Sequence, residues 1–234
     1  MTELLTLPRP EAVVFDFDGV IADTERLHCD TFLKVLAPHM ISFTWEEYVE
    51  RYMGCDDRDA FRKAFRLAGR DELDDRQMKK LVDAKSRQFL DAIRDGVRTY
   101  PGVVPLVKAL HAADIPLAIC SGALRSDLDP ILSRIGIACY FTLIVSAEDV
   151  RKGKPDPEGY IRAFRDLTLT RRGKVASAGS CLAVEDTPDG IKAAKRAGLP
   201  VLAVTNSHPA KDLSWADYVT DSLENVRMEG DRPA

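Results

Sequence analysis

The sequence lacks any long apolar run, because no stretch approaches the roughly 18 to 20 consecutive apolar residues that a membrane-spanning helix needs. Its first ten residues, MTELLTLPRP, lack the basic start and the apolar segment of a secretion signal. Basic charge is not in excess either, since the formal net charge is −4. These absences argue against binding to nucleic acid or to anionic membranes. We therefore expect a cytoplasmic protein with neither of these partners.

The cysteines and histidines show no regular spacing. The cysteines are five in number and far apart, with no CxxC pair and no histidine nearby at ligand spacing. This pattern argues against a disulfide framework and against a zinc site. We expect free thiols in a reducing compartment, at Cys29, Cys55, Cys120, Cys139 and Cys181.

Segments with strand and helix patterns alternate in most of the chain. Short apolar runs typical of strands buried on both faces lie at 13–15, 116–120, 142–146, 181–185 and 200–204. Segments with helical periodicity lie at 103–113, 126–135, 157–167 and 188–197. Such alternation is typical of a parallel sheet covered by helices. We expect an α/β fold with a Rossmann-like parallel sheet core and helices on both faces.

The segment from about residue 25 to residue 95 breaks this alternation. It is charged and helix-prone, with amphipathic stretches such as MKKLVDAKSRQFLDAI and no convincing buried strand. A chain of 234 residues is long enough for a core and a smaller second unit. We expect a helical cap domain at 24–95, inserted after the first strand, and a core domain at 1–23 and 96–234. The tail MEGDRPA is expected to fray.

Polar side chains follow four of the expected strands. Right-handed crossovers place the carboxyl ends of parallel strands along one edge of the sheet, so we expect these side chains to converge. Crowded carboxylates favour a hard cation such as Mg²⁺. A hydroxyl, a lysine and the start of the helix after SGA suit a phosphate group. The residues are Asp16 and Asp18, Ser121, Lys154 in KGKPDP, and Glu185 with Asp186.

These motifs resemble the four ordered motifs of the haloacid dehalogenase-like superfamily. The resemblance runs from Val13 to about Asn225 and is to the β-phosphoglucomutase and phosphoglycolate phosphatase-like branch, which has a helical cap inserted after the first motif. Any one motif is weak evidence, but four in this order after the expected strands are specific. The residues that carry the resemblance are DFDGV at 16–20, Ser121, Lys154 in GKPDP, and Glu185 with Asp186 in VEDTPDGIKAAKRAG.

The resemblance implies a role for each motif residue. Asp16 would be the nucleophile that attacks phosphorus to form an aspartyl-phosphate, and Asp18 would be the general acid and base. Asp18 also favours phosphoryl transfer, because the dehalogenase relatives generally lack this second aspartate. The transferring phosphoryl group would be bound by Ser121, Gly122 and Lys154. Mg²⁺ would be held by Asp16, the main-chain carbonyl of Asp18, Asp186 and, directly or through water, Glu185.

Each motif also has a structural explanation when it is taken alone. An Asp-x-Asp pair is often a solvated turn, and Ser121 could simply cap the helix that follows. KGKPDP could be a charged turn, while Glu185 and Asp186 could be acids of a first helical turn. The agreement among four motifs is what favours a functional site.

Residues of the expected cap give weaker signals. Thr24 and His28 lie one helical turn apart and match positions that carry a hinge threonine and a histidine near the acid/base aspartate in phosphoglucomutase-like relatives. Arg58 in YMGCDDRDAF resembles the substrate-specificity loop of such caps, offset by about one residue. Lys85 is a candidate that could reach the site or be solvated, and His28 could equally be an exposed helix residue. Arg125 is a further phosphate-binding candidate.

The expected function is that of a Mg²⁺-dependent phosphohydrolase. Its substrate would be a small phosphorylated metabolite, either a sugar phosphate or a phosphoglycolate-like acid, and the protein would act as a monomer. A phosphosugar mutase is an alternative, but mutase relatives carry serine and lysine where this chain has Ala123 and Leu124. A phospho-accepting signalling module without turnover is an alternative of another class. That module needs neither a cap nor an acid/base residue such as Asp18.

Overall fold

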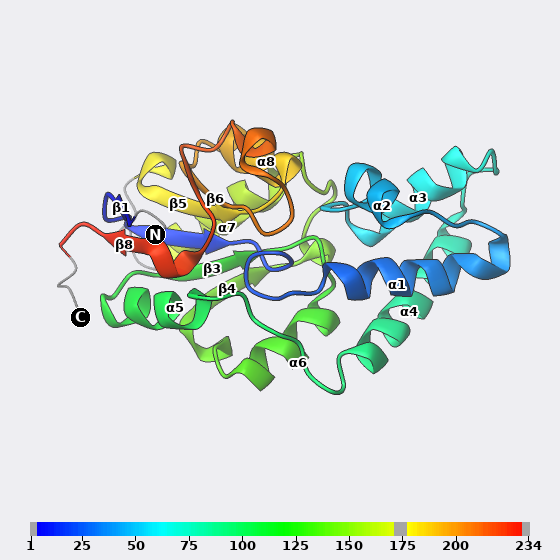
Figure 1. The fold of residues 1–234 in the computed structure, drawn as a ribbon, viewed down its shortest axis with the longest axis horizontal. Helices are drawn as coiled ribbons and strands as arrows, with labels where there is room; N and C mark the ends of the chain where they lie inside the picture. Colours follow the sequence, from blue (N-terminus) through cyan, green and yellow to red (C-terminus); the bar gives the residue numbers. More distant parts are fainter. Residues whose placement is uncertain (1–3, 171–176, 231–234) are drawn as a thin grey trace.

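The computed structural model describes residues 4–170 and 177–230, and the core of this part is a six-stranded sheet (Figure 1). The strand order is β4-β3-β2-β5-β6-β7, and every neighbouring pair is parallel. All carboxyl ends therefore lie along one edge, as the crossover rule requires. The strands are β2 (Ala12–Phe15), β3 (Leu117–Cys120), β4 (Phe141–Val145), β5 (Cys181–Glu185), β6 (Val201–Val204) and β7 (Tyr218–Thr220).

Helices cover both faces of this sheet. Val13 and Phe15 of β2 belong to an apolar cluster with α5 and α6, whereas Ala12 and Val14 belong to a second cluster with α7 and α8. Figure 1 shows α5 and α6 below the sheet and α8 above it. The expected α/β fold with a Rossmann-like core is confirmed. These helices are α5 (Val103–Ala112), α6 (Arg125–Ile135), α7 (Glu158–Thr170) and α8 (Pro188–Arg196).

Four helices without a strand fill the segment between β2 and α5. Their buried apolar side chains form a third cluster, which includes Phe32, Phe61 and Met78. We call α1–α4 the helical unit, and Figure 1 shows it grouped at one end of the molecule. Phe89 near the end of α4 belongs instead to the apolar cluster that the sheet forms with α5 and α6. Part of α4 therefore packs against the core, and the domain limits at 24 and 95 stay a prediction. The helices are α1 (Glu25–Leu36), α2 (Trp45–Arg51), α3 (Asp57–Leu67) and α4 (Asp75–Ala92).

Short elements near the chain ends were not expected from the sequence. Strand β1 (Leu5–Leu7) pairs in parallel with β8 (Val226–Met228), and the Glu229 N–H donates to the Leu7 carbonyl at 2.8 Å. The tail expected to fray therefore begins inside a strand, while 231–234 lie outside the described residues. Among the described helices, none combines the length and apolar character needed to cross a membrane. Short 3₁₀ helices lie at Ala37–His39, Ala138–Tyr140, Ala147–Asp149, Ala178–Ser180, Ala210–Leu213 and Leu223–Asn225.

The packing of the helical unit gives a testable prediction. Phe61 is fully buried and lies edge-to-face against Phe32, with ring centroids 5.1 Å apart. We expect Phe61→Ala to lower the free energy of unfolding by about 3–5 kcal/mol, because it removes buried area and leaves a cavity. Urea unfolding followed by circular dichroism measures this. The control is Leu67→Ala on the same helix, 54% exposed, which should change stability by less than about 0.5 kcal/mol. Equal effects of the two variants would contradict the packing.

Candidate active site

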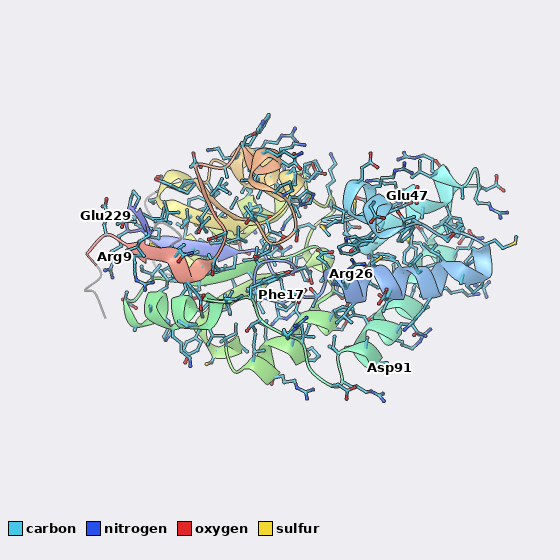
Figure 2. The ribbon with its side chains drawn as sticks, viewed as in Figure 1. Arg9, Phe17, Arg26, Glu47, Asp91 and Glu229 are labelled. Atoms are coloured by element: carbon cyan, nitrogen blue, oxygen red, sulfur yellow. The ribbon has the colours of Figure 1, made fainter. Side chains whose placement is uncertain are left out.

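The loop after β2 carries Asp16 and Asp18 to the carboxyl edge of the sheet. The Asp16 N–H donates to the carbonyl of Val184 at 2.9 Å, which extends the pairing of β2 with β5. Phe17 is buried between the two aspartates, and Figure 2 labels it where the sheet meets the helical unit. Its carbonyl accepts a hydrogen bond of 2.8 Å from the N–H of Ile21. This tight turn fixes both carboxylates at the edge.

Lys154 lies between two buried carboxylates. Its Nζ atom is 2.8 Å from Oδ1 of Asp16 and 2.7 Å from Oε1 of Glu185. Tyr160 on α7 donates its hydroxyl to the same Glu185 oxygen at 2.6 Å. Burial lowers the pKa of Lys154, but the neighbouring Asp16 and Glu185 outweigh burial and raise that pKa above its ordinary value. The ammonium group therefore stays charged.

Asp186 joins Asp16 and Glu185 in a buried acidic cluster. Each offers one oxygen, and these three oxygens lie within 4.8 Å of one another. Burial and then the charges of the other carboxylates raise the pKa of Asp186 and of Asp16 well above ordinary values, although Lys154 opposes this for Asp16. Oδ2 of Asp186 accepts a hydrogen bond from Ser207, whereas its buried Oδ1 has no hydrogen-bond partner within the described residues. Three crowded carboxylates, of which only Asp16 and Glu185 contact the ammonium group of Lys154, can hold a metal ion.

Two glycines allow the chain to approach these carboxylates closely. Gly19 has a φ of +76°, and a Cβ atom there would lie 1.8 Å from Oδ2 of Asp186. A Cβ atom at Gly190 in α8 would lie 2.1 Å from each oxygen of the Glu185 carboxylate. Any larger residue would displace the carboxylates. The glycines in DFDGV and TPDG are therefore part of the site's geometry.

Asp18 lies at the junction of the sheet and the helical unit. Its Oδ1 accepts a hydrogen bond of 2.5 Å from the Thr24 hydroxyl and lies 3.0 Å from Nε2 of His28 on α1. The Ser121 hydroxyl is 3.4 Å from its Oδ2. Burial raises the pKa of Asp18, but the interactions with His28 and Thr24, together with the charge of Lys85, lower that pKa to about 2. Asp18 is therefore ionised at neutral pH in this structure.

Lys85 is fully buried behind His28. Its Nζ atom lies 2.8 Å from Nδ1 of His28, 2.9 Å from Oδ1 of Asp57 and 4.0 Å from Oδ2 of Asp127 on α6. Because a lysine ammonium only donates hydrogen bonds, Nδ1 of His28 must accept and its Nε2–H must donate to Asp18. The histidine ring also stacks on Phe89, with centroids 4.3 Å apart. This chain of contacts fixes both the tautomer and the orientation of His28.

A pocket lies between the sheet edge and the helical unit. Seven residues named from the sequence do not line this pocket: Thr24, Arg58, Lys85, Ser121, Arg125, Glu185 and Asp186. Arg58 and Arg125 are exposed, and Arg125 pairs with Asp129 at 2.7 Å. Thr24 and Ser121 contact Asp18, which lines the pocket. The lining consists of Asp16, Asp18, Glu25, His28, Phe32, Tyr48, Gly54, Cys55, Asp57, Gly122, Ala123, Lys154 and Thr187.

The sequence reasoning missed several residues of the site. Ser207 follows strand β6, so the rule that placed the other strand-end residues could have found it. Tyr160 lies on the buried face of a predicted helix, where an aromatic residue suggests only packing. The sequence did not indicate that Asp57 and Glu25 line the pocket, because their burial depends on how α3 and α1 pack over the sheet.

Taken together, the fold and site define an α/β enzyme that gathers carboxylates, a lysine and a serine at the carboxyl edge of a parallel sheet, beneath a helical unit. The profile described as haloacid dehalogenase-like hydrolase matches residues 13–204, and the chain belongs to this family. The superfamily and branch expected from the motifs are confirmed.

Similar proteins include enzymes that act on phosphate esters. A phosphorylated carbohydrates phosphatase of Thermotoga maritima is 30% identical over 190 residues, covering 81% of this chain and 82% of that protein. The plasmid-encoded CbbY protein of Cupriavidus necator is 27% identical over 212 residues, covering 86% and 81%. The crystal structure of β-phosphoglucomutase from Clostridium difficile has a TM-score of 0.80, 21% identity and 93% coverage of both chains, which shows the shared fold. The expected enzyme class, a phosphatase of this superfamily, is confirmed.

The charge balance at Lys154 gives a second prediction. We expect Lys154→Met to lower the free energy of unfolding by about 3–5 kcal/mol at pH 7.5, because it leaves Asp16 and Glu185 buried without their cation. Urea unfolding in the presence of a chelator measures the effect. Lys152→Met is the control, since the Lys152 side chain is 75% exposed. A loss below about 1 kcal/mol for Lys154→Met would contradict the role of Lys154 in neutralising the cluster.

Proposed function

We propose that the protein is a Mg²⁺-dependent phosphatase that hydrolyses a small phosphorylated metabolite through a phosphorylated Asp16. The observation that carries the proposal is the contact of Lys154 with Asp16 and Glu185 in a cluster with Asp186. A carboxylate nucleophile and a cation site then lie within one group of side chains, as phosphoryl transfer requires. The proposal extends the family membership to a reaction and to residue roles.

The unpartnered Oδ1 of buried Asp186 and its crowding with Asp16 and Glu185 suit a divalent ion with oxygen ligands. These carboxylates, with the main-chain carbonyl of Asp18, would hold Mg²⁺. When bound, the ion would offset the negative charge of the carboxylates and of the substrate phosphate. Ser207 holds the second oxygen of Asp186 and so fixes how this carboxylate faces the cluster.

Asp16 acts as the nucleophile in this proposal. It must be ionised to attack phosphorus, and burial opposes ionisation because it raises the pKa of Asp16. Lys154 lowers that pKa through its charge and its hydrogen bond, and so favours the reactive form. Lys154, Ser121 and Gly122 then bind the phosphoryl oxygens. The same lysine thus serves both the nucleophile and the group it attacks.

Asp18 carries the proton in this proposal. It is ionised in the substrate-free structure, and the Nε2–H of His28 donates to it. A phosphate group close to Asp18 raises its pKa by like-charge repulsion, so Asp18 takes up a proton as the substrate binds. It then protonates the leaving alcohol and afterwards activates the water that releases phosphate from Asp16. His28, held by Lys85, orients the carboxylate through both steps.

The third prediction concerns turnover. With Mg²⁺, the purified protein should release phosphate from 4-nitrophenyl phosphate over many cycles, and Asp16→Asn should lower kcat at least about a hundredfold because it removes the nucleophile. Circular dichroism checks that the variant is folded. The control is Asp30→Asn on the exposed face of α1, which should keep full activity.

Other outcomes of this assay would support other functions. Release of one equivalent or less would favour the signalling module. Conversion of β-glucose 1-phosphate to its isomer, without release of phosphate, would favour the mutase. Full activity of Asp16→Asn would contradict the proposed reaction.

A further inference from the structure

Most of the charged side chains that line the pocket over Asp16 are acidic. Among the residues that the structure describes, its lining includes the carboxylates of Asp16, Asp18, Glu25 and Asp57. The basic groups of the lining are Lys154 and His28. Lys154 contacts Asp16 and Glu185, and the two ring nitrogens of His28 contact Asp18 and Lys85. The pocket therefore has no cation left over for a second negative group on the substrate.

Asp57 is the side chain that α3 places in this pocket. Its side chain is 9% exposed, with Oδ1 paired to Lys85 at 2.9 Å and Oδ2 buried without a hydrogen-bond partner in the described residues. The neighbouring Arg58 is exposed and does not line the pocket. Asp56 caps α3 and accepts a hydrogen bond from the Asp59 N–H at 2.9 Å. This cap fixes where α3 begins and so which residue of its first turn lines the pocket. At the start of α3, the carboxylate of Asp57 therefore lines the pocket, and the neighbouring Arg58 does not.

Glu25 adds a second acceptor in the helical unit. It is 7% exposed at the start of α1, and its Oε2 accepts a hydrogen bond of 2.7 Å from the hydroxyl of Tyr48. This hydrogen bond holds the Glu25 carboxylate in one orientation. Tyr48 also lines the pocket. Buried carboxylates accept hydrogen bonds from hydroxyl groups and repel anions. Glu25 and Asp57 thus place hydrogen-bond acceptors in the lining of the pocket.

We propose, building on the phosphatase activity proposed above, that Asp57 and Glu25 select phosphate monoesters whose leaving alcohol is uncharged and rich in hydroxyl groups. They discriminate against leaving groups that carry a carboxylate or a second phosphate. Selection of this kind works by repulsion of the wrong ligand as well as by attraction of the right one. Of the two substrate classes expected from the sequence, the site takes a sugar monophosphate and rejects a phosphoglycolate-like acid.

The test uses matched esters that differ by one charge. The pairs are 2-hydroxyethyl phosphate with phosphoglycolate, and glucose 6-phosphate with 6-phosphogluconate. The hydroxyl member of each pair should have a kcat/KM at least about tenfold higher, because the buried carboxylate of Asp57 repels a second carboxylate close to it. Asp57→Asn should reduce this ratio at least about threefold, by raising kcat/KM for the acidic member relative to its partner. Asp59→Asn, whose side chain pairs with Arg62 on the same helix, should leave it unchanged.

Failure of the inference and failure of the phosphatase proposal give different results. If 4-nitrophenyl phosphate is hydrolysed but both members of each pair react equally, the selectivity is overturned while the phosphatase activity stands. Binding of the same pairs to Asp16→Asn, measured by calorimetry, tests selectivity without turnover, and equal affinities there overturn it. Glu25→Gln provides a second variant if Asp57→Asn unfolds. If the ratio of kcat/KM between the members of each pair is unchanged in every folded variant, these carboxylates do not set the selectivity and the proposal is overturned.

Discussion

The balance of charge at the carboxyl edge of the sheet is the constraint on which the site depends. Asp16, Glu185 and Asp186 are buried together, and Lys154 is the ammonium group in contact with two of them. Burial favours the protonated form of a carboxyl group, and a protonated Asp16 could not attack phosphorus. Oδ1 of Asp186 is buried without a hydrogen-bond partner in the described residues, and Gly19 and Gly190 let the chain approach the carboxylates closely. These features support the proposal that a further positive charge binds here.

The helical unit supplies contacts to Asp18 as well as part of the lining of the pocket. Asp18 belongs to the sheet edge, but its hydrogen-bond partners Thr24 and His28 stand at the start of α1. His28 is in turn held by Lys85 of α4, which contacts Asp57 of α3. The geometry around Asp18, the proposed acid and base, therefore depends on the packing of three helices. The same packing places the acidic side chains of Glu25 and Asp57 in the lining of the pocket.

The sequence predicted five of the six strands of the sheet and the residues at their carboxyl ends, because short apolar runs between helical patterns follow simple rules of pattern and handedness. It could not predict β1, β7 and β8, which are three residues each and acquire their pairing only from tertiary contact. Nor could it predict the burial of Lys85, since a buried lysine requires partners from distant segments, here His28 and Asp57. Arg58 was named for the pocket, but whether it has a role in binding stays a prediction.

Calorimetric titration with Mg²⁺ tests the central claim most directly. The claim is that the carboxylates around Lys154 form a cation site. The account predicts saturable binding to the unaltered protein and binding at least about tenfold weaker to Asp186→Asn, because a neutral amide replaces a buried carboxylate. Asp189→Asn, in the partly exposed first turn of α8, should bind like the unaltered protein. Equal affinity in all three proteins, or no binding to any, would contradict the account.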